Sequence, residues 1–281
     1  MNSPSHNGKV PNVKAVPAKA ASRQEERHRL VTEAVMTAGT VAIEDLARMF
    51  DVSVMTIHRD LDQLEAQNVL RKSRGVATAL PSSTVESNDA YRRAQQRDEK
   101  RDLAAAALTF IQPGQTLMLD DSTTVLPLLD LLNTRTPLTV ASNNLSVING
   151  LVDTEDVELV LVGGEYRSWC NAFMGQMTLD AIAALQADVL MMSTSAVTGT
   201  ACYHQRQDTI SIKRALMAAA ATSILLVDHT KFERRAMFRL CALADFDHVV
   251  VDSATPAATV DALRQQHGSV TVAPPRALSA S

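Results

Sequence analysis

The sequence predicts two folded units, a small helical unit that ends in a β-hairpin and a larger α/β unit with a mostly parallel sheet. In the first unit, apolar residues recur at helical spacing in three consecutive stretches, and two short β-prone runs follow around Gly75. From Gln115 to about Val272, short apolar runs alternate with amphipathic stretches, and the six runs expected to form strands are 117–119, 138–141, 157–162, 189–192, 224–227 and 249–251. Strand and helix in alternation are typical of a parallel sheet with helices on its faces.

The composition is that of an ordinary globular protein. Of the 281 residues, 46% are hydrophobic, which is enough to form real cores. No apolar run approaches the ~20 residues that a membrane helix needs, and the N-terminus lacks an apolar signal segment, so a cytoplasmic protein without a membrane partner is expected. No metal and no cofactor is predicted, because no His/Cys/Asp spacing indicates a metal site. The cysteines lie far apart and predict neither a disulfide framework nor a zinc cluster: Cys170, Cys202 and Cys241.

The charge is divided unevenly along the chain. The net charge is −4, but residues 1–101 hold 16 Lys and Arg against 13 Asp and Glu, whereas residues 102–281 hold 11 against 18. Opposite signs fit a DNA-facing first part and an acidic second part. The asymmetry is modest, and charge alone does not predict nucleic-acid binding.

Changes in composition divide the chain into five segments. Turn-forming residues at 81–84 and 87–89 indicate a hinge, and a charged helix is expected from Tyr91 to about Ile111, where Pro113-Gly114 stops it. The expected segments are a disordered tail at 1–22, a first unit at 23–80, a linker and the start of a connecting helix at 81–100, the α/β unit at 101–272 and a flexible tail at 273–281.

Three helices are expected in the first unit. The first ends near Gly39, and Ser53 caps the third, which follows the two-residue turn Asp51-Val52. The residues that share one face of the first and of the second helix are Leu30, Val31, Ala34 and Ala38, and then Ile43, Leu46, Ala47 and Phe50. On the third helix the core residues are Ile57, Leu61 and Leu64, while Met55, Arg59 and Asp62 point away and Thr56 and His58 lie on the flanks.

A hairpin should follow the third helix, because residues 69–72 and 76–80 can pair around Gly75. Together these elements make a winged helix-turn-helix, which presents the N-terminal half of its third helix to DNA bases. Arginine can contact guanine in a bidentate manner, and basic wing residues can hold phosphates. The residues predicted to bind DNA are Ser53, Met55, Thr56, His58, Arg59, Arg71, Lys72 and Arg74. The pattern alone leaves open a protein-interaction module with a solvated charged face.

The residues of the third helix also resemble a known family signature. Residues 52–65 read V-S-V-M-T-I-H-R-D-L-D-Q-L-E, and the DeoR family of bacterial regulators reads roughly V-S-x-x-T-I-R-R-D-L-x-x-L-E before a basic wing. Two positions depart from this pattern. His58 stands where the family usually has Arg, and Gly75-Val76 stands where the wing typically carries Gly-Gly. The resemblance implies a DNA-binding transcription regulator, and the departures affect the strength and sequence of its DNA contact.

The resemblance extends over roughly residues 25–255. DeoR-type sensor domains look like sugar-phosphate isomerases and bind phosphorylated sugars. The matching segments are 119–124 for the family's D-S-G-T-T loop, 142–143 for its T-N, 163–167 for G-G-x-x-R, 213–215 for K-R-A and 228–232 for D-x-S-K-F. The residues that the resemblance assigns to the ligand are Asp120, Asp121, Ser122, Thr123, Thr124, Asn143, Gly163, Gly164, Lys213, Asp228 and Lys231.

The chemistry of these segments suits a phosphorylated ligand. A hydroxyl-rich loop that opens a helix offers amides and a positive dipole end to an anion, and Thr123 or Thr124 as N-cap would place Pro127 in the first turn. Lys213 and Lys231 can supply charge to a phosphate. The extra carboxylate in Asp120-Asp121 should turn toward sugar hydroxyls. Each segment taken alone is compatible with an ordinary cap, turn or solvated lysine.

Binding is favoured over catalysis. An aldose-ketose isomerase fused to a helix-turn-helix would need a positioned carboxylate. The sugar-phosphate isomerases that this unit resembles carry an acidic cluster after the fourth strand, but here residues 193–197 read S-T-S-A-V and the next carboxylate is Asp208. Cys202 beside His204 is better explained as a buried residue than as a nucleophile. The predicted function is a repressor of a carbohydrate-utilisation operon, controlled by a phosphorylated sugar. It should bind double-stranded operator DNA as a homodimer or homotetramer. A DNA-independent scaffold is the remaining alternative.

Overall fold

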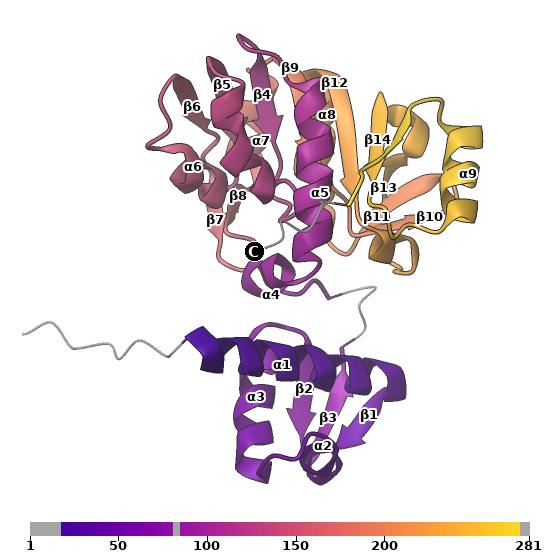
Figure 1. Cartoon of the computed structure of the whole chain (residues 1–281). Coiled ribbons are helices and arrows are strands. Elements are labelled where there is room, and N and C mark those ends of the chain that lie inside the picture. Colours follow the sequence, from indigo (N-terminus) through magenta and orange to yellow (C-terminus); the bar gives the residue numbers. More distant parts are fainter. Residues whose placement is uncertain (1–17, 81–84, 276–281) are drawn as a thin grey trace, which may run out of the picture. The chain divides into compact units, whose positions relative to one another are not determined.

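The computed structural model describes residues 18–80 and 85–275, which divide between two compact units, Met1–Ala79 and Leu80–Ser281 (Figure 1). The elements of the first unit are α1 (Ala18–Ala38), β1 (Thr40–Ala42), α2 (Ile43–Met49), α3 (Val54–Ala66), β2 (Leu70–Ser73) and β3 (Val76–Ala79). Helix α1 begins five residues before position 23, so residues 18–22 are helical and not part of a disordered tail. The rest of that predicted tail, the predicted hinge at 81–84 and the chain end 276–281 lie outside the described residues.

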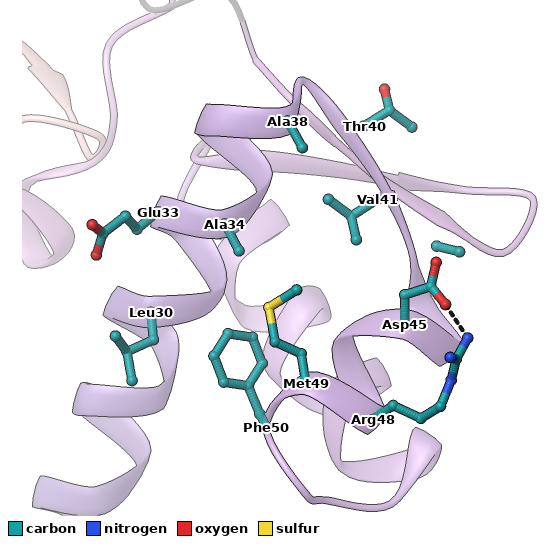
Figure 2. Close-up of a pocket in the computed structure, with 11 residues that line it drawn as sticks. Leu30, Glu33, Ala34, Ala38, Thr40, Val41, Asp45, Arg48, Met49 and Phe50 are labelled. Carbon is teal, nitrogen blue, oxygen red and sulfur yellow. Dashed lines mark hydrogen bonds and ion pairs between the residues drawn. The ribbon is translucent and has the colours of Figure 1, made fainter.

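The buried face of α1 is centred on Val31 and Val35, which are fully buried one helical turn apart. The predicted face was therefore wrong in part, because it omitted Val35. The other predicted residues of that face, together with residues of α2, line an open groove between the two helices (Figure 2): Leu30, Ala34 and Ala38 of α1, and Met49 and Phe50 at the end of α2. On α2 the predicted core residues Ile43, Leu46 and Ala47 are buried.

Helix α3 follows the sequence prediction closely. The Ser53 hydroxyl accepts a hydrogen bond from the amide of Thr56 at 3.1 Å and caps the helix. Ile57, Leu61 and Leu64 are buried. Strands β2 and β3 form the predicted antiparallel hairpin, and β1 adds a third strand on the far side of β3. The periodicity of the sequence gave no sign of β1, because three residues are too few to show an alternation.

A buried carboxylate joins α3 to α1. Asp60 is 1% exposed and accepts hydrogen bonds from Arg27 Nε at 2.5 Å and Arg27 Nη2 at 3.0 Å, while His28 Nε2 lies 2.9 Å away. Burial would raise the pKa of Asp60, but His28 and Arg27 outweigh it and lower the pKa below its ordinary value. This cluster holds α3 against α1.

The second unit contains the α/β fold. Its elements are α4 (Asp89–Ala94), α5 (Arg97–Ala107), η1 (Leu108–Phe110), β4 (Thr116–Leu119), η2 (Leu126–Thr134), β5 (Leu138–Ser142), α6 (Leu145–Leu151), β6 (Val157–Leu161), β7 (Glu165–Arg167), β8 (Ala172–Met174), α7 (Gln176–Ala183), β9 (Ala187–Met192), β10 (Ala196–Thr198), β11 (Ala201–His204), α8 (Gln207–Ala218), β12 (Ala220–Val227), η3 (His229–Phe232), β13 (Phe238–Ala242), η4 (Leu243–Asp245), β14 (His248–Val251), α9 (Ala257–Gln266) and β15 (Val270–Val272).

The main sheet has seven strands in the order β15-β14-β12-β9-β4-β5-β6, and every pair in it is parallel. All six predicted strand segments lie in this sheet, so the parallel α/β prediction is confirmed. Strands β5 and β6 lie on one side of β4, and the later strands β9, β12, β14 and β15 lie on its other side, so the order of strands switches between β4 and β9. In an open parallel sheet, that switch point opens a crevice at the carboxyl ends of the strands, where ligands bind.

Alternate side chains of each strand enter two different cores. Leu117 and Leu119 face the core formed with α5, η2 and α6, whereas Met118 between them faces the core formed with α7, α8 and α9. Helices therefore cover both faces of the sheet (Figure 1). In the described part of the chain, no helix is both long and apolar enough to cross a membrane.

The predicted connecting helix is broken. Instead of one helix from Tyr91 to Ile111, the chain forms α4 and α5, separated at Gln96, which has a left-handed φ of 51°. The predicted hinge at 87–89 is also wrong. Asn88 caps α4 through the amide of Tyr91 at 2.9 Å, and the Asp89 amide donates to the carbonyl of Trp169 at 2.8 Å.

Two further predictions need correction. The element after the first strand is the 3₁₀ segment η2, whose N-cap is Val125 with no side-chain hydrogen bond, so neither Thr123 nor Thr124 caps it. Pro127 does lie in its first turn, as predicted. The structure also contains the antiparallel sheet β10-β11-β13, the pair β7-β8 and the edge strand β15, none of which was predicted from the sequence. Cys202 is fully buried in β11 opposite Cys241, which confirms its assignment to the core.

The Asp60 cluster generates a stability prediction. Asp60→Asn should lower the free energy of unfolding of the first unit by about 3 kcal/mol, because Arg27 and His28 lose their buried anionic partner. Since the pKa of Asp60 is lowered in the fold, its contribution is present above the ordinary carboxyl pKa and is lost as the pH falls through the lowered value. Hydrogen exchange of peptides from residues 40–79 in the full chain measures this.

The matched control is Glu44→Gln, an exposed position on α2 in the same unit. It should change protection by no more than about 0.5 kcal/mol, as is usual for surface substitutions. Equal protection in the two variants would show that the buried cluster does not stabilise this unit.

Candidate nucleic-acid interface and ligand pocket

The predicted recognition surface is exposed on the first unit. Met55 is 61% exposed at the start of α3, and Arg59 is exposed one turn later. Thr56 and His58 are half-buried beside them. The Thr56 hydroxyl lies 2.8 Å from the hydroxyl of its cap, Ser53, so both belong to the first turn of the helix. Within this unit, α3 therefore exposes the polar side that its sequence periodicity predicts to be exposed.

The hairpin places basic side chains at its tip. Strand β2 ends at Ser73 and β3 begins at Val76, and the two residues between them have positive φ angles of 48° for Arg74 and 80° for Gly75. This is the backbone of a two-residue turn of the kind that matches the twist of a hairpin. Arg74 is exposed there, and Arg71 is exposed on β2.

Lys72 differs from its basic neighbours. Its ammonium forms an ion pair with Asp62 of α3, and its amide donates to Glu65 Oε1 at 3.0 Å. These contacts fasten the wing to the recognition helix. Lys72 thus holds β2 and α3, the two elements predicted to face DNA, in a fixed relation, and a role in contacting phosphates stays a prediction for it.

In the second unit, a buried ion pair lies at the switch point of the sheet. Asp120 follows β4 and is fully buried. Its Oδ1 accepts from the Ser122 amide at 3.0 Å and the Ser122 hydroxyl at 2.5 Å, and its Oδ2 accepts from the Ser193 amide at 3.1 Å and from Lys213 Nζ. Both oxygens are occupied by the protein, so the prediction that this carboxylate turns toward sugar hydroxyls gains no support from the geometry.

Lys213 is also buried and paired with other residues of the protein. It is 2% exposed, pairs with Asp120, and lies 3.2 Å from Asp121 Oδ1. Burial would lower the pKa of Lys213, but the two carboxylates outweigh it and raise the pKa above its ordinary value. Its charge is balanced within the fold, and a direct contact with a phosphate stays a prediction.

A pocket with excess positive charge lies between α4, α5 and the loops after β4 and β12. We call it the cationic pocket. The residues that line it are Ser87, Tyr91, Arg92, Gln95, Gln96, Lys100, Thr123, Asp228, Thr230, Lys231 and Arg234. Four of these residues are basic and one is acidic. The predicted ligand residues Thr123, Asp228 and Lys231 meet here.

Lys100 is buried and Lys231 is half-buried in the cationic pocket, and both carry lowered pKa values. Burial lowers the pKa of Lys100 to about 7, and the charge of Lys231 acts in the same direction. Burial lowers the pKa of Lys231 to about 8, although Asp228 acts against this. Lys100 Nζ donates to Thr123 Oγ1 at 3.1 Å and to the Arg92 carbonyl at 2.5 Å. An anion would relieve the mutual repulsion of these cations.

Asp228 positions the loop that carries Lys231. It caps η3 by accepting from the Thr230 amide at 3.1 Å and from the Thr230 hydroxyl, and its Oδ2 lies 3.9 Å from Lys231 Nζ. Burial would raise the pKa of Asp228, but Lys231 and the Thr230 hydrogen bond outweigh it and lower the pKa. A carboxylate in this state is a weak base, which suits a positioning role.

The remaining predicted ligand residues lie elsewhere at the sheet edge. The Asn143 amide group donates to the Phe173 carbonyl at 2.9 Å, and its Oδ1 is buried without a hydrogen-bond partner in the described structure. At Gly164, an added Cβ would lie 2.0 Å from Thr178 Oγ1, so packing alone requires glycine there. Gly163 has open space. Ser122 hydrogen-bonds to Asp120, and Thr124 is buried.

Two family models match the chain. The DeoR-like helix-turn-helix domain matches residues 27–83, and the DeoR C terminal sensor domain matches residues 95–253. The chain belongs to the DeoR family. Its two units thus correspond to the helix-turn-helix and sensor domains of this family, and the resemblance found in the sequence is confirmed.

Relatives of known name align over most of the DeoR-family chain. The glycerol-3-phosphate regulon repressor of Escherichia coli (strain K12) is 34% identical over 250 residues, which are 87% of this chain and 97% of that protein. The lactose phosphotransferase system repressor of Lactococcus lactis subsp. lactis is 31% identical over 235 residues, 82% of this chain and 91% of that protein. Among solved structures, ribose 5-phosphate isomerase A from Methanocaldococcus jannaschii is 14% identical in sequence. The alignment covers 49% of this chain and 55% of that chain, and its TM-score of 0.37 is too low to support an inference.

Sequence reasoning missed the basic residues of the connecting segment. Arg92 and Lys100 fall in a charged stretch that is easily taken for a solvated helix face. One signal was available for Lys100, since it precedes Leu103 and Ala104 by three and four residues and so lies on the buried stripe of α5. Arg92 carried no such signal, because the break at Gln96 separates it from that stripe.

The exposed face of α3 generates a DNA-binding prediction. Arg59→Ala should weaken binding to a labelled duplex of the protein's own promoter by about 1–3 kcal/mol and relax its sequence preference, because a bidentate base contact is lost. Fluorescence anisotropy at fixed salt measures this. Arg29→Ala, an exposed arginine on α1 paired with Glu26 and Glu33, is the control and should bind nearly as the unaltered protein does. Unchanged affinity in the Arg59 variant would remove this residue from the interface.

Proposed function

We propose that this DeoR-family chain is a repressor whose affinity for operator DNA is controlled by a phosphorylated sugar or polyol bound in the sensor domain. The observation that carries the proposal is the cationic pocket, in which Arg92, Lys100, Lys231 and Arg234 surround one carboxylate at the carboxyl ends of parallel strands. A phosphoryl dianion is the ligand chemistry that such an excess of charge fits. The names of the relatives, one a glycerol-3-phosphate regulon repressor, support the same class.

The protein should act as a cytoplasmic homo-oligomer. A single winged helix-turn-helix makes few base contacts, so a dimer or tetramer is needed to engage repeated half-sites. A ligand can alter the DNA affinity only if it binds the DNA-binding and the DNA-releasing conformations of the protein with different affinities. That difference is typically about 1–3 kcal/mol.

An aldose-ketose isomerase remains the second candidate function, but the residues that line the pocket favour ligand binding over catalysis. The acidic residue that lines it is Asp228, whose lowered pKa makes it a weak proton acceptor. Asp208, the first carboxylate after the S-T-S-A-V segment, is paired with Arg206 at 2.7 Å. Incubation with ribose 5-phosphate tests this candidate, and turnover lost in Asp208→Asn or Asp228→Asn would favour the enzyme.

The role of Lys231 is the direct test of the proposal. Lys231→Ala should leave operator binding intact and abolish the release of DNA by glycerol 3-phosphate or related sugar phosphates, since a cation of the pocket is removed. Promoter-duplex anisotropy with a titration of each ester measures both effects. Arg235→Ala, an exposed neighbour outside the pocket, should respond as the unaltered protein does. If sugar phosphates still release DNA from Lys231→Ala, the proposal that this pocket binds the effector is refuted.

The lowered pKa values predict how the ligand affinity depends on pH. A phosphoryl group with a second pKa of about 6 is a dianion above neutrality and binds the protonated ammonium groups. Because the pKa values of Lys100 and Lys231 are about 7 and about 8, each lysine must regain a proton on binding at higher pH. The affinity for glycerol 3-phosphate should therefore fall between about pH 7 and 9, by up to about tenfold per unit for each lysine.

Calorimetry across this range measures the profile. Besides each other, the charged groups that face the two lysines are Asp228, Glu86, Arg92 and Arg234, and the charges of these four groups stay constant over this range. Lys100→Arg, whose guanidinium stays protonated, should flatten the profile. An affinity independent of pH in the unaltered protein would contradict the prediction.

A further inference from the structure

The guanidinium of Arg92 in α4 has one occupied edge and one empty edge. Its Nη1 lies 3.0 Å from Glu86 Oε1. Its Nε and Nη2 are buried and have no hydrogen-bond partner among the described residues. The side chain is only 16% exposed, and it lines the cationic pocket. A buried charged donor without a partner is costly, by about 1–3 kcal/mol or more.

The same edge is filled at another arginine of this chain. Arg27 uses Nε and Nη2 to hold the two carboxylate oxygens of Asp60, at 2.5 and 3.0 Å. These two nitrogens form a planar fork that matches two oxygens of one carboxylate or phosphoryl group. In Arg92 the fork is oriented by Glu86, whose carboxylate is held in the charged form. Burial would raise the pKa of Glu86, but His204 and Arg92 outweigh it and lower the pKa.

The surroundings of the fork select an anion. Lys100, Lys231 and Arg234 line the same pocket, and Lys100 is joined to the carbonyl of Arg92 itself at 2.5 Å. Asp228, which lies 3.9 Å from Lys231, and Glu86, which pairs with Arg92, compensate only part of the charge of the four basic residues. Water could satisfy one donor at a time, but a phosphoryl group offers oxygens to both nitrogens of the fork and to the lysines together.

We propose that Arg92 binds the phosphoryl group of the effector through its Nε and Nη2 edge, with Lys100 as the second donor, so that helix α4 is itself part of the effector site. This inference rests on the proposed function of the sensor domain. Helix α4 is the first helix of the second unit after the connection from the helix-turn-helix unit. A ligand held jointly by Arg92 of α4 and Lys231 of η3 would clamp that helix to the ends of the sheet.

The chain offers a matched control in the adjacent residue. Arg93 lies on the same helix but pairs with Asp89 at 2.5 Å and with Ser146, outside the pocket. Arg92→Lys retains the charge that pairs with Glu86 and removes only the planar fork. Arg93→Lys makes the same chemical change without touching the proposed site.

The experiment is calorimetric titration of the full chain with glycerol 3-phosphate, ribose 5-phosphate and inorganic phosphate, with glycerol as the uncharged control. Arg92→Lys should weaken the binding of every phosphate probe bound by the unaltered protein by at least about tenfold, because a bidentate charged contact is lost. Lys100→Gln should weaken it similarly. Arg93→Lys should stay within about twofold. Melting temperatures without ligand and promoter affinity should be alike in all variants, which separates a binding defect from misfolding.

The outcomes distinguish the two proposals. If Arg92→Lys binds the phosphate probes as the unaltered protein does, Arg92 is not part of the site and this inference is overturned, and loss of binding in Lys231→Ala would then show that the pocket itself survives. If the unaltered protein binds none of the phosphate probes, the proposed function and this inference both fail. Equal weakening in Arg92→Lys and Arg93→Lys would assign the effect to the stability of α4 and would also overturn the inference.

Discussion

The buried pair between Asp120 and Lys213 is the constraint on which the rest of the sensor domain depends. Asp120 joins the loop after β4, the amide of Ser193 after β9, and Lys213 of α8, and so closes the crevice at the switch point of the sheet. Breaking such a pair on one side leaves an uncompensated buried charge, at a cost of about 3–5 kcal/mol. The pair therefore fixes the floor of this crevice.

Because the pair neutralises Lys213, the positive charge for a ligand has to come from elsewhere. The chain supplies it from the connecting segment, through Arg92 and Lys100, and from the η3 loop, through Lys231. Removal from water lowers the pKa values of both lysines, Lys100 and Lys231, to about 7 and about 8. Such groups gain more from an incoming anion than solvated lysines would, since the anion replaces the water that they have lost.

The sequence allowed much of the fold to be predicted and only part of the site. The six parallel strands were predictable because each apolar run is bounded by turn residues, and α3 because Ser53 and Ile57 follow the spacing of a capped helix. The break at Gln96 was not predictable, since a left-handed glutamine leaves no mark in the sequence. The Asp120–Lys213 pair joins positions 93 residues apart, a separation over which periodicity carries no information.

If the effector binds as proposed, the break at Gln96 gives it a way to act on the connection between the two domains. A continuous helix from Tyr91 to Ile111 would carry Arg92 away from Lys100 by about 12 Å, at 1.5 Å per residue. The left-handed turn instead folds α4 back, so that Lys100 reaches the Arg92 carbonyl. A ligand that binds both residues stabilises the folded-back arrangement over any straighter one. Only such a difference in affinity between two arrangements lets a ligand shift their equilibrium.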